Sequence, residues 1–267
     1  MTLKLWQVDA FADKPFSGNP AAIVPLEAWI DDGLMQRIAN ENNLAETAFF
    51  VAKGKGDYHL RWFTPTVEVD LCGHATLASA WTILEILDPS LARVSFETRS
   101  GTLVVDRGPD GRHIMSLPSV TASPMTDAGL PGKIADALGT TRPLEVYSAR
   151  NVMAVFETAA DVRRIAGVGR IADVIAGDMG LIATAPGGEG YDFVSRYFAP
   201  HHGISEDPVT GSAHTALTPY WAKRLGKKTL KARQVSPRGG DLICTDAGER
   251  TILSGPCALY MTAEIEI

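Results

Sequence analysis

The sequence predicts an α/β fold built from two similar halves, each a rolled, mostly antiparallel sheet around one central helix. Short strand-like runs outnumber helical ones, and one markedly apolar helix stands in each half of the chain. Landmarks of the first half also return in the second half in the same order. A repeat of this length forms a whole domain rather than one turn of a solenoid.

Four short segments carry the repeat. The pairs are SGNPAAIV (17–24) with ARNVMAVF (149–156), RWFTP (61–65) with RYFAP (196–200), CGHATLASAW (72–81) with TGSAHTALTPYW (210–221), and RSGTLVV (99–105) with RGGDLIC (238–244). Each pair is short, but all four keep their order and nearly constant spacing. We therefore interpret the chain as an internal duplication.

The elements of the first half follow from residue spacing. Alternating or short apolar runs predict strands, and apolar residues at helical spacing predict helices. In chain order these are a strand at 3–10, a strand at 21–26, a helix at 31–43, strands at 46–54 and 57–65, a helix at 73–87 and two strands within 93–107.

A stretch of turn-forming residues, SVTASPMTDAGLPG (119–132), interrupts this regular pattern. We therefore expect an N-terminal domain at 1–120 and a C-terminal domain at 121–267. The final strand, within CALYMTAEIEI (257–267), has the alternative of pairing with the first domain.

Composition narrows the classes of function. The chain has 267 residues, 45% hydrophobic and 21% charged, as an ordinary globular protein does. Its net charge of -6 gives no reason to expect nucleic acid or an anionic membrane as a partner. No apolar run reaches the length of about 18 residues that a membrane span needs, and the first residues lack a signal-peptide core. Three well-separated cysteines argue against a disulfide framework, so we expect a cytoplasmic protein.

Each half has a glycine that opens its apolar helix, Gly73 in the first and Gly211 in the second. The free N–H groups and dipole of a helix start attract anions, and glycine lets a ligand approach the backbone closely. Because similar domains commonly enclose a cleft, the two helix starts are predicted to bind a carboxylate or an enolate-like intermediate. The alternative is that both glycines are plain helix starts.

The repeat also tests whether Cys72 acts as a base. A two-thiol racemase needs a second cysteine on the opposite face of its substrate. The repeat aligns Cys72 with Thr210, which cannot form a thiolate. We therefore expect Cys72 to be a packed small side chain that lines the site and contacts substrate.

Two carboxylates and a histidine are the candidate acid/base groups. Glu46 follows a helix and opens a very apolar strand, where partial desolvation would suit proton transfer. His74 and Ser212 occupy equivalent positions, one residue after each helix glycine, and Asp207 precedes the second helix. Asp207 would orient His74 or a substrate. The alternatives are a solvated Glu46 and an ordinary turn role for Asp207.

A metal site is not expected. His201 and His202 are adjacent, with Asp207 and His214 nearby in sequence, but no metal-ligand spacing such as HExxH occurs. The chain also lacks GxGxxG and GxxxxGK[ST] phosphate motifs, so no cofactor is expected.

These segments, in this order, resemble the PhzF family, named for the phenazine biosynthesis isomerase. The matching segments are DAFADKPFSGNPAAIV, NNLAETAFF, RWFTPTVEVDLCGHATLASA, RYFAPHHGISEDPVTGSAH and SPRGGDL, which extend over almost the whole chain. The resemblance implies the fold of diaminopimelate epimerase, with a sheet rolled around a helix in each domain. It also implies a cofactor-independent homodimer.

In the phenazine enzyme of that family a glutamate moves a proton along its substrate, and the resemblance implies that Glu46 is this glutamate. His74, Asp207 and Ser212 match the other polar site residues, and Gly73 and Gly211 match the backbone positions at the helix starts. We therefore expect an isomerase acting on a small carboxylic acid. Two alternatives stay open: an amino-acid epimerase or racemase, which needs bases on both faces, and a non-catalytic small-molecule binder.

Overall fold

The computed structural model describes residues 1–166, 170–175, 177 and 179–267. The chain divides into two compact units: unit 1 is Met1–Leu117 with Leu253–Ile267, and unit 2 is Pro118–Ile252. The sequence-based boundary at 120/121 lies close to residues 117/118, where the chain first passes from unit 1 to unit 2. Residues 253–267 belong to unit 1 rather than to the second domain, in agreement with the alternative in which the final strand pairs with the first domain. There β18 (Cys257–Glu266) pairs antiparallel with β1 (Thr2–Ala10), on whose other side β2 lies.

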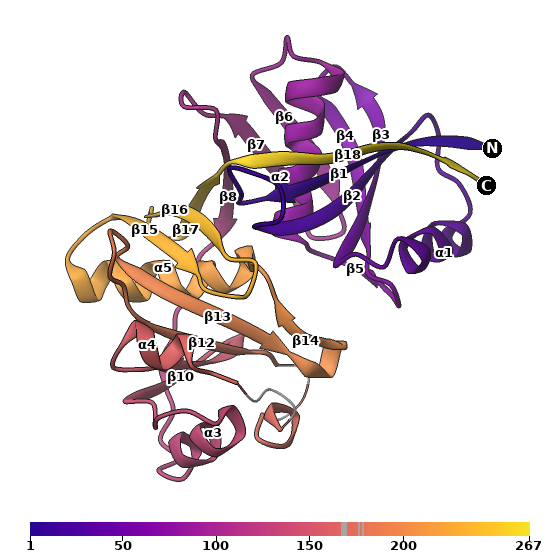
Figure 1. The fold of residues 1–267 in the computed structure, drawn as a ribbon. Helices are drawn as coiled ribbons and strands as arrows, with labels where there is room; N and C mark the ends of the chain where they lie inside the picture. Colours follow the sequence, from indigo (N-terminus) through magenta and orange to yellow (C-terminus); the bar gives the residue numbers. More distant parts are fainter. Residues whose placement is uncertain (167–169, 176, 178) are drawn as a thin grey trace. The chain divides into compact units, whose positions relative to one another are not determined.

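Unit 1 is a curved sheet with a helix in its interior (Figure 1). Its remaining elements are β2 (Asn19–Leu26), α1 (Asp32–Asn42), β3 (Glu46–Gly54), β4 (Asp57–Phe63), β5 (Glu68–Val69), α2 (Gly73–Thr82), β6 (Arg93–Thr98), β7 (Gly101–Arg107) and β8 (His113–Pro118). The strands pair in the order β18–β1–β2–β3–β4–β6–β7–β8, and β5 lies beside β4. The β2–β3 and β4–β6 pairs are parallel and the others are antiparallel, which confirms the mostly antiparallel sheet.

The central helix α2 is buried on every side. Small residues make this possible, since Ala75, Ala78 and Ala80 are fully buried and let the surrounding strands approach closely. The helix expected at 73–87 changes at Ile83 into a single π-turn, Ile83–Leu87. The buried helix α2 differs from α1, which lies at the surface and whose N-cap Asp31 accepts a hydrogen bond from the Leu34 N–H.

Unit 2 repeats this arrangement around α5 (Gly211–Leu225). Its other elements are β9 (Ser123–Pro124), α3 (Leu130–Leu138), β10 (Glu145–Ala149), β11 (Asn151–Val155), α4 (Ala159–Arg163), β12 (Leu181–Pro186), β13 (Phe193–Ala199), β14 (Ile204–Asp207), β15 (Thr229–Gln234) and β16 (Gly240–Asp246). The strand β17 (Arg250–Gly255) crosses the boundary, because the chain passes from unit 2 back to unit 1 between residues 252 and 253. The β11–β12 and β13–β15 pairs are parallel, as their counterparts β2–β3 and β4–β6 are in unit 1. The internal duplication predicted from the sequence is therefore a duplication of topology.

One partly buried ion pair is repeated as well. Arg61 on β4 makes two hydrogen bonds to the carboxylate of Glu68, at 2.7 and 2.8 Å. At the equivalent place in unit 2, Arg196 on β13 bonds Glu206 at 2.6 and 2.8 Å. Each guanidinium also lies over a phenylalanine two residues along its own strand. These pairs fasten the short strands β5 and β14, which lead to the starts of the central helices.

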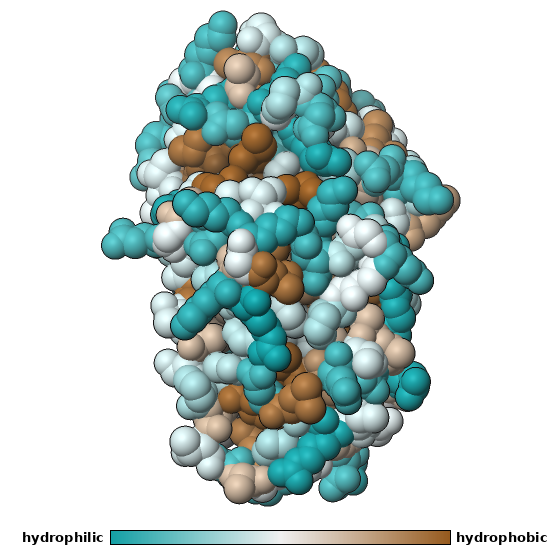
Figure 2. Space-filling view, turned by 90° about the vertical axis from the view of Figure 1, so that its left-hand side faces the viewer, coloured by the Kyte–Doolittle hydropathy of each residue, from teal (hydrophilic) through white to brown (hydrophobic). Residues whose placement is uncertain are grey.

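Apolar residues on the outside of the molecule do not form one continuous face in the view of Figure 2, where brown patches are separated by hydrophilic residues. Among the described helices, none has both the length and the apolar character needed to cross a membrane.

Candidate active site

A buried carboxylate and a buried imidazole meet in unit 1. Glu46 is the first residue of β3, and His74 is the second residue of α2. Glu46 Oε2 lies 3.1 Å from His74 Nε2, and the two side chains are only 11% and 6% exposed. Neither atom makes a hydrogen bond with ideal angles to another described residue. The two groups therefore interact through charge while both retain capacity to hydrogen-bond a ligand.

The second nitrogen of His74 is held by two neighbours. The Asn19 side-chain nitrogen lies 3.1 Å from His74 Nδ1, and Cys72 Sγ lies 3.4 Å from the same atom. When Asn19 donates to Nδ1, the ring proton must be on Nε2, the nitrogen that faces Glu46. A rotated amide presents an acceptor instead, so Asn19 is able to pair with either charge state of the ring.

The surroundings determine the charge on His74. Burial lowers its pKa, but the neighbouring Cys72 and Glu46 outweigh burial and raise the pKa well above the ordinary value. Burial, followed by the negative charge of Glu46, raises the pKa of Cys72 to about 11. The Cys72 thiol is consequently neutral near pH 7, so the Glu46 carboxylate is the anion that stabilises the imidazolium.

Glu46, Cys72 and His74 bring their ligand atoms within 4.8 Å of one another, close enough to ask whether they hold a metal. However, Cys72 contacts Nδ1 of the ring and Glu46 contacts Nε2. The imidazole thus lies between the other two ligand atoms, and an ion bound to one of its nitrogens would face only one of them. This arrangement suits a proton relay better than a metal site.

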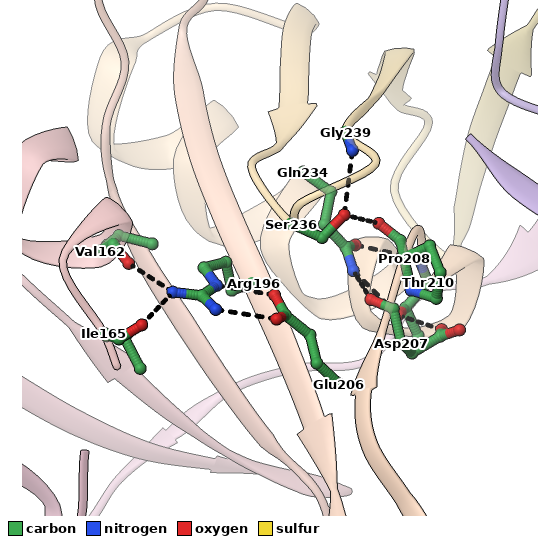
Figure 3. Close-up of polar contacts among 10 residues, drawn as sticks. All are labelled: Val162, Ile165, Arg196, Glu206, Asp207, Pro208, Thr210, Gln234, Ser236 and Gly239. Atoms are coloured by element: carbon green, nitrogen blue, oxygen red, sulfur yellow. Dashed lines mark hydrogen bonds and ion pairs between the residues drawn. The ribbon is translucent and has the colours of Figure 1, made fainter. Parts of the chain in front are cut away.

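Unit 2 presents a second polar cluster, built around Asp207 (Figure 3). The Thr210 hydroxyl donates to Asp207 Oδ2, and the Thr210 N–H donates to Gln234 Oε1 at 2.9 Å. Gln234, which is fully buried, returns a hydrogen bond from Nε2 to the Asp207 carbonyl at 2.7 Å. On the other side, Ser236 donates to the Pro208 carbonyl at 2.8 Å. The network fixes the Asp207 carboxylate just before α5 begins.

The helix starts have matching geometry in the two units. Cys72 and Thr210 are the N-cap residues of α2 and α5, both in extended conformation, and neither side chain caps its helix. The first-turn N–H groups after Gly73 and Gly211 are therefore not used by the caps, as an anion-binding helix start requires. Ser212, in the first turn of α5, is exposed.

The structure thus brings Glu46, Cys72, Gly73 and His74 together in unit 1, and Asp207, Gly211 and Ser212 together in unit 2. Whether Asp207 orients His74, and whether both helix starts bind one ligand, stay predictions. Sequence reasoning missed Asn19 and Gln234, because a lone amide has no motif of its own. The repeat held a signal for Asn19, which aligns with Asn151.

The histidines considered as metal ligands have other surroundings. His214 is fully buried and donates from Nδ1 to the Thr210 carbonyl at 2.8 Å, within its own helix. His201 Nε2 lies 3.1 Å from the Ile175 carbonyl. The side chain of His202 lies outside the described part of the structure.

A family model described as "Phenazine biosynthesis-like protein" matches residues 8–262. Two Pseudomonas aeruginosa proteins named as uncharacterised isomerases are 48% and 44% identical to this chain, each over the full length of both proteins. A PhzF family protein of Enterococcus faecalis, whose crystal structure is known, has a TM-score of 0.94 and 40% identity, with both chains completely covered.

A more distant structure supports the fold only. A hydroxyproline epimerase from Agrobacterium vitis superimposes with a TM-score of 0.59 at 12% identity, covering 99% of this chain and 92% of the other. Together with the repeated topology, this confirms the predicted epimerase-like architecture of two rolled units. By its fold and by the match along nearly its whole length, the chain belongs to the PhzF, or phenazine biosynthesis-like, family.

Proposed function

We propose that the protein is a cofactor-independent isomerase that moves a proton on a small carboxylic acid, with Glu46 as the acid/base. The observation that carries the proposal is the buried pair in which Glu46 Oε2 lies 3.1 Å from His74 Nε2. A carboxylate in a partly dry site, next to a group able to take or supply a proton, has the properties of a general base.

The reaction needs no net oxidation and no leaving group. The Glu46 carboxylate removes a proton from a carbon activated by the substrate's carboxylate or a neighbouring double bond. The electron pair left behind shifts along the conjugated system, and the protonated Glu46 returns the proton to a different carbon. His74, held by Asn19, stabilises the carboxylate form of Glu46 before the proton is removed and again after it has been returned. The first-turn N–H groups of α2 are suited to stabilise the developing negative charge.

Divergence between the two repeats favours one base over two. In unit 1, Ala21 lies two positions after Asn19 and pairs with Glu46 across β2 and β3. In unit 2, Met153 lies two positions after Asn151 and pairs with Ile182 across β11 and β12. The position equivalent to Glu46 in unit 2 is therefore an aliphatic residue that cannot carry a proton. One base on one face is expected to shift a double bond rather than invert a stereocentre.

The residues of unit 2 are assigned to substrate binding. Asp207 is rigidly held and accepts a hydrogen bond from Thr210, and Ser212 presents an exposed hydroxyl one residue after the helix glycine. A fixed carboxylate and a hydroxyl are suited to bind or polarise amino or hydroxyl groups on a substrate. Asp207 is proposed to contact the reacting molecule, while Gly211 provides backbone N–H groups.

The test is proton NMR in D₂O of the phenazine-pathway substrate and a panel of unsaturated and amino-bearing carboxylic acids, each incubated with wild type and with Glu46→Gln. Wild type should incorporate deuterium and move a double bond, and Glu46→Gln should lose both by about 10²–10⁴-fold. Glu27→Gln, at an exposed position, is the matched control and should retain full activity. Persistent exchange in Glu46→Gln would remove Glu46 from the mechanism.

The same spectra separate the competing functions. A changed configuration at an unmoved carbon would instead identify an epimerase or racemase. Stabilisation by a ligand without deuterium uptake in wild type would identify a binding protein.

We also propose that the protein is a homodimer. Support comes from an exposed apolar cluster on unit 1, in which Leu259, Tyr260 and Met261 are 38%, 46% and 40% exposed. Phe16, 74% exposed, packs its ring against Tyr260 at 5.5 Å. Exposed apolar clusters of this kind commonly mark contacts between subunits. Light scattering should give twice the chain mass of 28.6 kDa, and Tyr260→Lys should weaken the dimer. A monomeric wild type would contradict the proposal.

A further inference from the structure

A pocket in unit 2 lies among residues that the proposed mechanism does not use. Its volume is about 530 Å³, within the usual range for small-molecule sites. One wall is the chain around Ala122 and Pro124, and another is Tyr147 on β10. The third wall is the last part of α5, which contributes Tyr220 and Lys223.

A proline within α5 helps to build the first wall. Pro219 has no N–H, so the carbonyl of Thr215, one helical turn earlier, loses its usual helical partner. The N–H of Val120 donates to that carbonyl instead, at 3.0 Å. This bond fixes the segment that continues to Ala122 and Pro124 against the helix. The wall is therefore held by the backbone rather than by mobile side chains.

The aromatic wall is equally well fixed. The rings of Tyr147 and Tyr220 pack edge to face with centroids 5.3 Å apart. Their hydroxyls both donate to Glu145 Oε2, at 2.6 and 3.2 Å. Tethered at the hydroxyl end, the two rings form a preorganised apolar surface, which lowers the entropic cost of binding a flat molecule.

The charge in the pocket is positive overall. Arg224 lies 2.6 Å from Glu145 Oε1 and is neutralised by it. Lys223 is exposed, and within the described ranges no acidic side chain comes within ion-pair distance of its ammonium group. One cation thus remains beside an apolar, aromatic pocket, a combination suited to a single carboxylate on a flat apolar body.

We propose that this pocket binds a planar aromatic monocarboxylic acid, with its ring against Tyr147 and Tyr220 and its carboxylate at Lys223. The site is independent of Glu46 and of the proposed isomerisation. All of the residues that line the pocket belong to unit 2, whereas Glu46 and His74 belong to unit 1.

The experiment is an NMR titration of the full chain, with ¹³C in its tyrosine rings, using 2-naphthoate as the probe. Tyr147→Phe and Tyr220→Phe assign the two ring signals. We expect saturable shifts of both signals, and weaker binding of 2-naphthalenemethanol, which lacks the charge, and of cyclohexanecarboxylate, which lacks the aromatic ring. Reading the tyrosine signals separates this pocket from any binding of an aromatic acid elsewhere.

The decisive comparison is between two lysines. Lys223→Gln should raise the dissociation constant about two- to fivefold, the range for one exposed charge pair. Lys228→Gln, an exposed lysine that does not line the pocket, should leave the constant unchanged. Absent shifts of the two rings, equal binding of the uncharged probe, or equal effects of the two substitutions would each overturn the proposal.

Discussion

Protonation of one buried histidine should make the protein less stable in mild acid. His214 is completely enclosed within unit 2, and burial lowers its pKa to about 4, only partly offset by its bond to the Thr210 carbonyl. In the unfolded chain the same imidazole titrates near its ordinary pKa of 6.5. The unfolded state therefore binds a proton that the folded state does not bind between these two values.

The magnitude follows from the size of this shift. Each unit of pKa difference corresponds to 1.36 kcal/mol, so the shift amounts to about 3 kcal/mol. The stability provided by neutral His214 is fully present above pH 6.5 and is lost as the pH falls towards 4. His74 has a raised pKa, so its contribution is fully present below pH 6.5 and is lost only at higher pH. It therefore does not obscure the effect.

The assay is urea unfolding between pH 7.5 and 4.5, comparing wild type with His214→Gln, in which an amide can still bond the Thr210 carbonyl. The comparison with the variant is needed because burial also lowers the pKa of His113, so protonation of that residue also destabilises the folded protein as the pH falls. Wild type should lose stability relative to the variant by up to about 1.4 kcal/mol for each pH unit below 6.5. Parallel curves for the two proteins would refute the assignment of His214 as a buried neutral group.

Five further substitutions test other parts of the structure. Cys72→Ser should keep deuterium exchange within about tenfold of wild type, because a thiol with a pKa of about 11 is not the base; a complete loss would contradict the role given to the carboxylate. Arg196→Met should lower the free energy of urea unfolding by about 1–3 kcal/mol, since it leaves the partly buried carboxylate of Glu206 without its charge partner. Arg61→Met should cost less, because another arginine also binds its partner, and equal costs would contradict this. Gly180→Ala should lower the free energy of unfolding by about 1–3 kcal/mol, because its new Cβ would lie 2.4 Å from the hydroxyl of Tyr197. Gly188→Ala meets no atom within 4 Å and should change that free energy by less than about 1 kcal/mol. Equal effects of the two substitutions would refute the steric explanation.

The sequence predicts the architecture well because both repeats carry the same local signals. Helix starts marked by Gly73 and Gly211, and the Arg-aromatic-Phe strands, recur at nearly constant spacing. The return of residues 253–267 to unit 1 was only an alternative, because pairing between the two ends of a chain leaves no local pattern. The π-turn after α2 was missed for a similar reason, since its apolar residues fit an α-helix equally well.

The candidate site was predictable in its composition but not in its contacts. The motif GHAT places His74 at a helix start, yet nothing local shows that β3 brings Glu46 to its Nε2. The buried amides of Asn19 and Gln234 were missed because their importance comes from the atoms that they face. Tertiary pairing, rather than residue type, makes these groups part of the site.

The route of the chain through unit 1 has a consequence for how the protein is made. Unit 2 is one continuous segment, 118–252, and its residues have all been synthesised before the residues of β18. Unit 1 acquires its last strand only when residues 257–266 leave the ribosome and pair along β1. Unit 1, whose first strands are translated before unit 2, is therefore the last unit to be completed. Until β18 pairs with it, β1 has an unpaired edge to which other strands can bind. A truncation that removes only the final strand would damage the unit that was translated first.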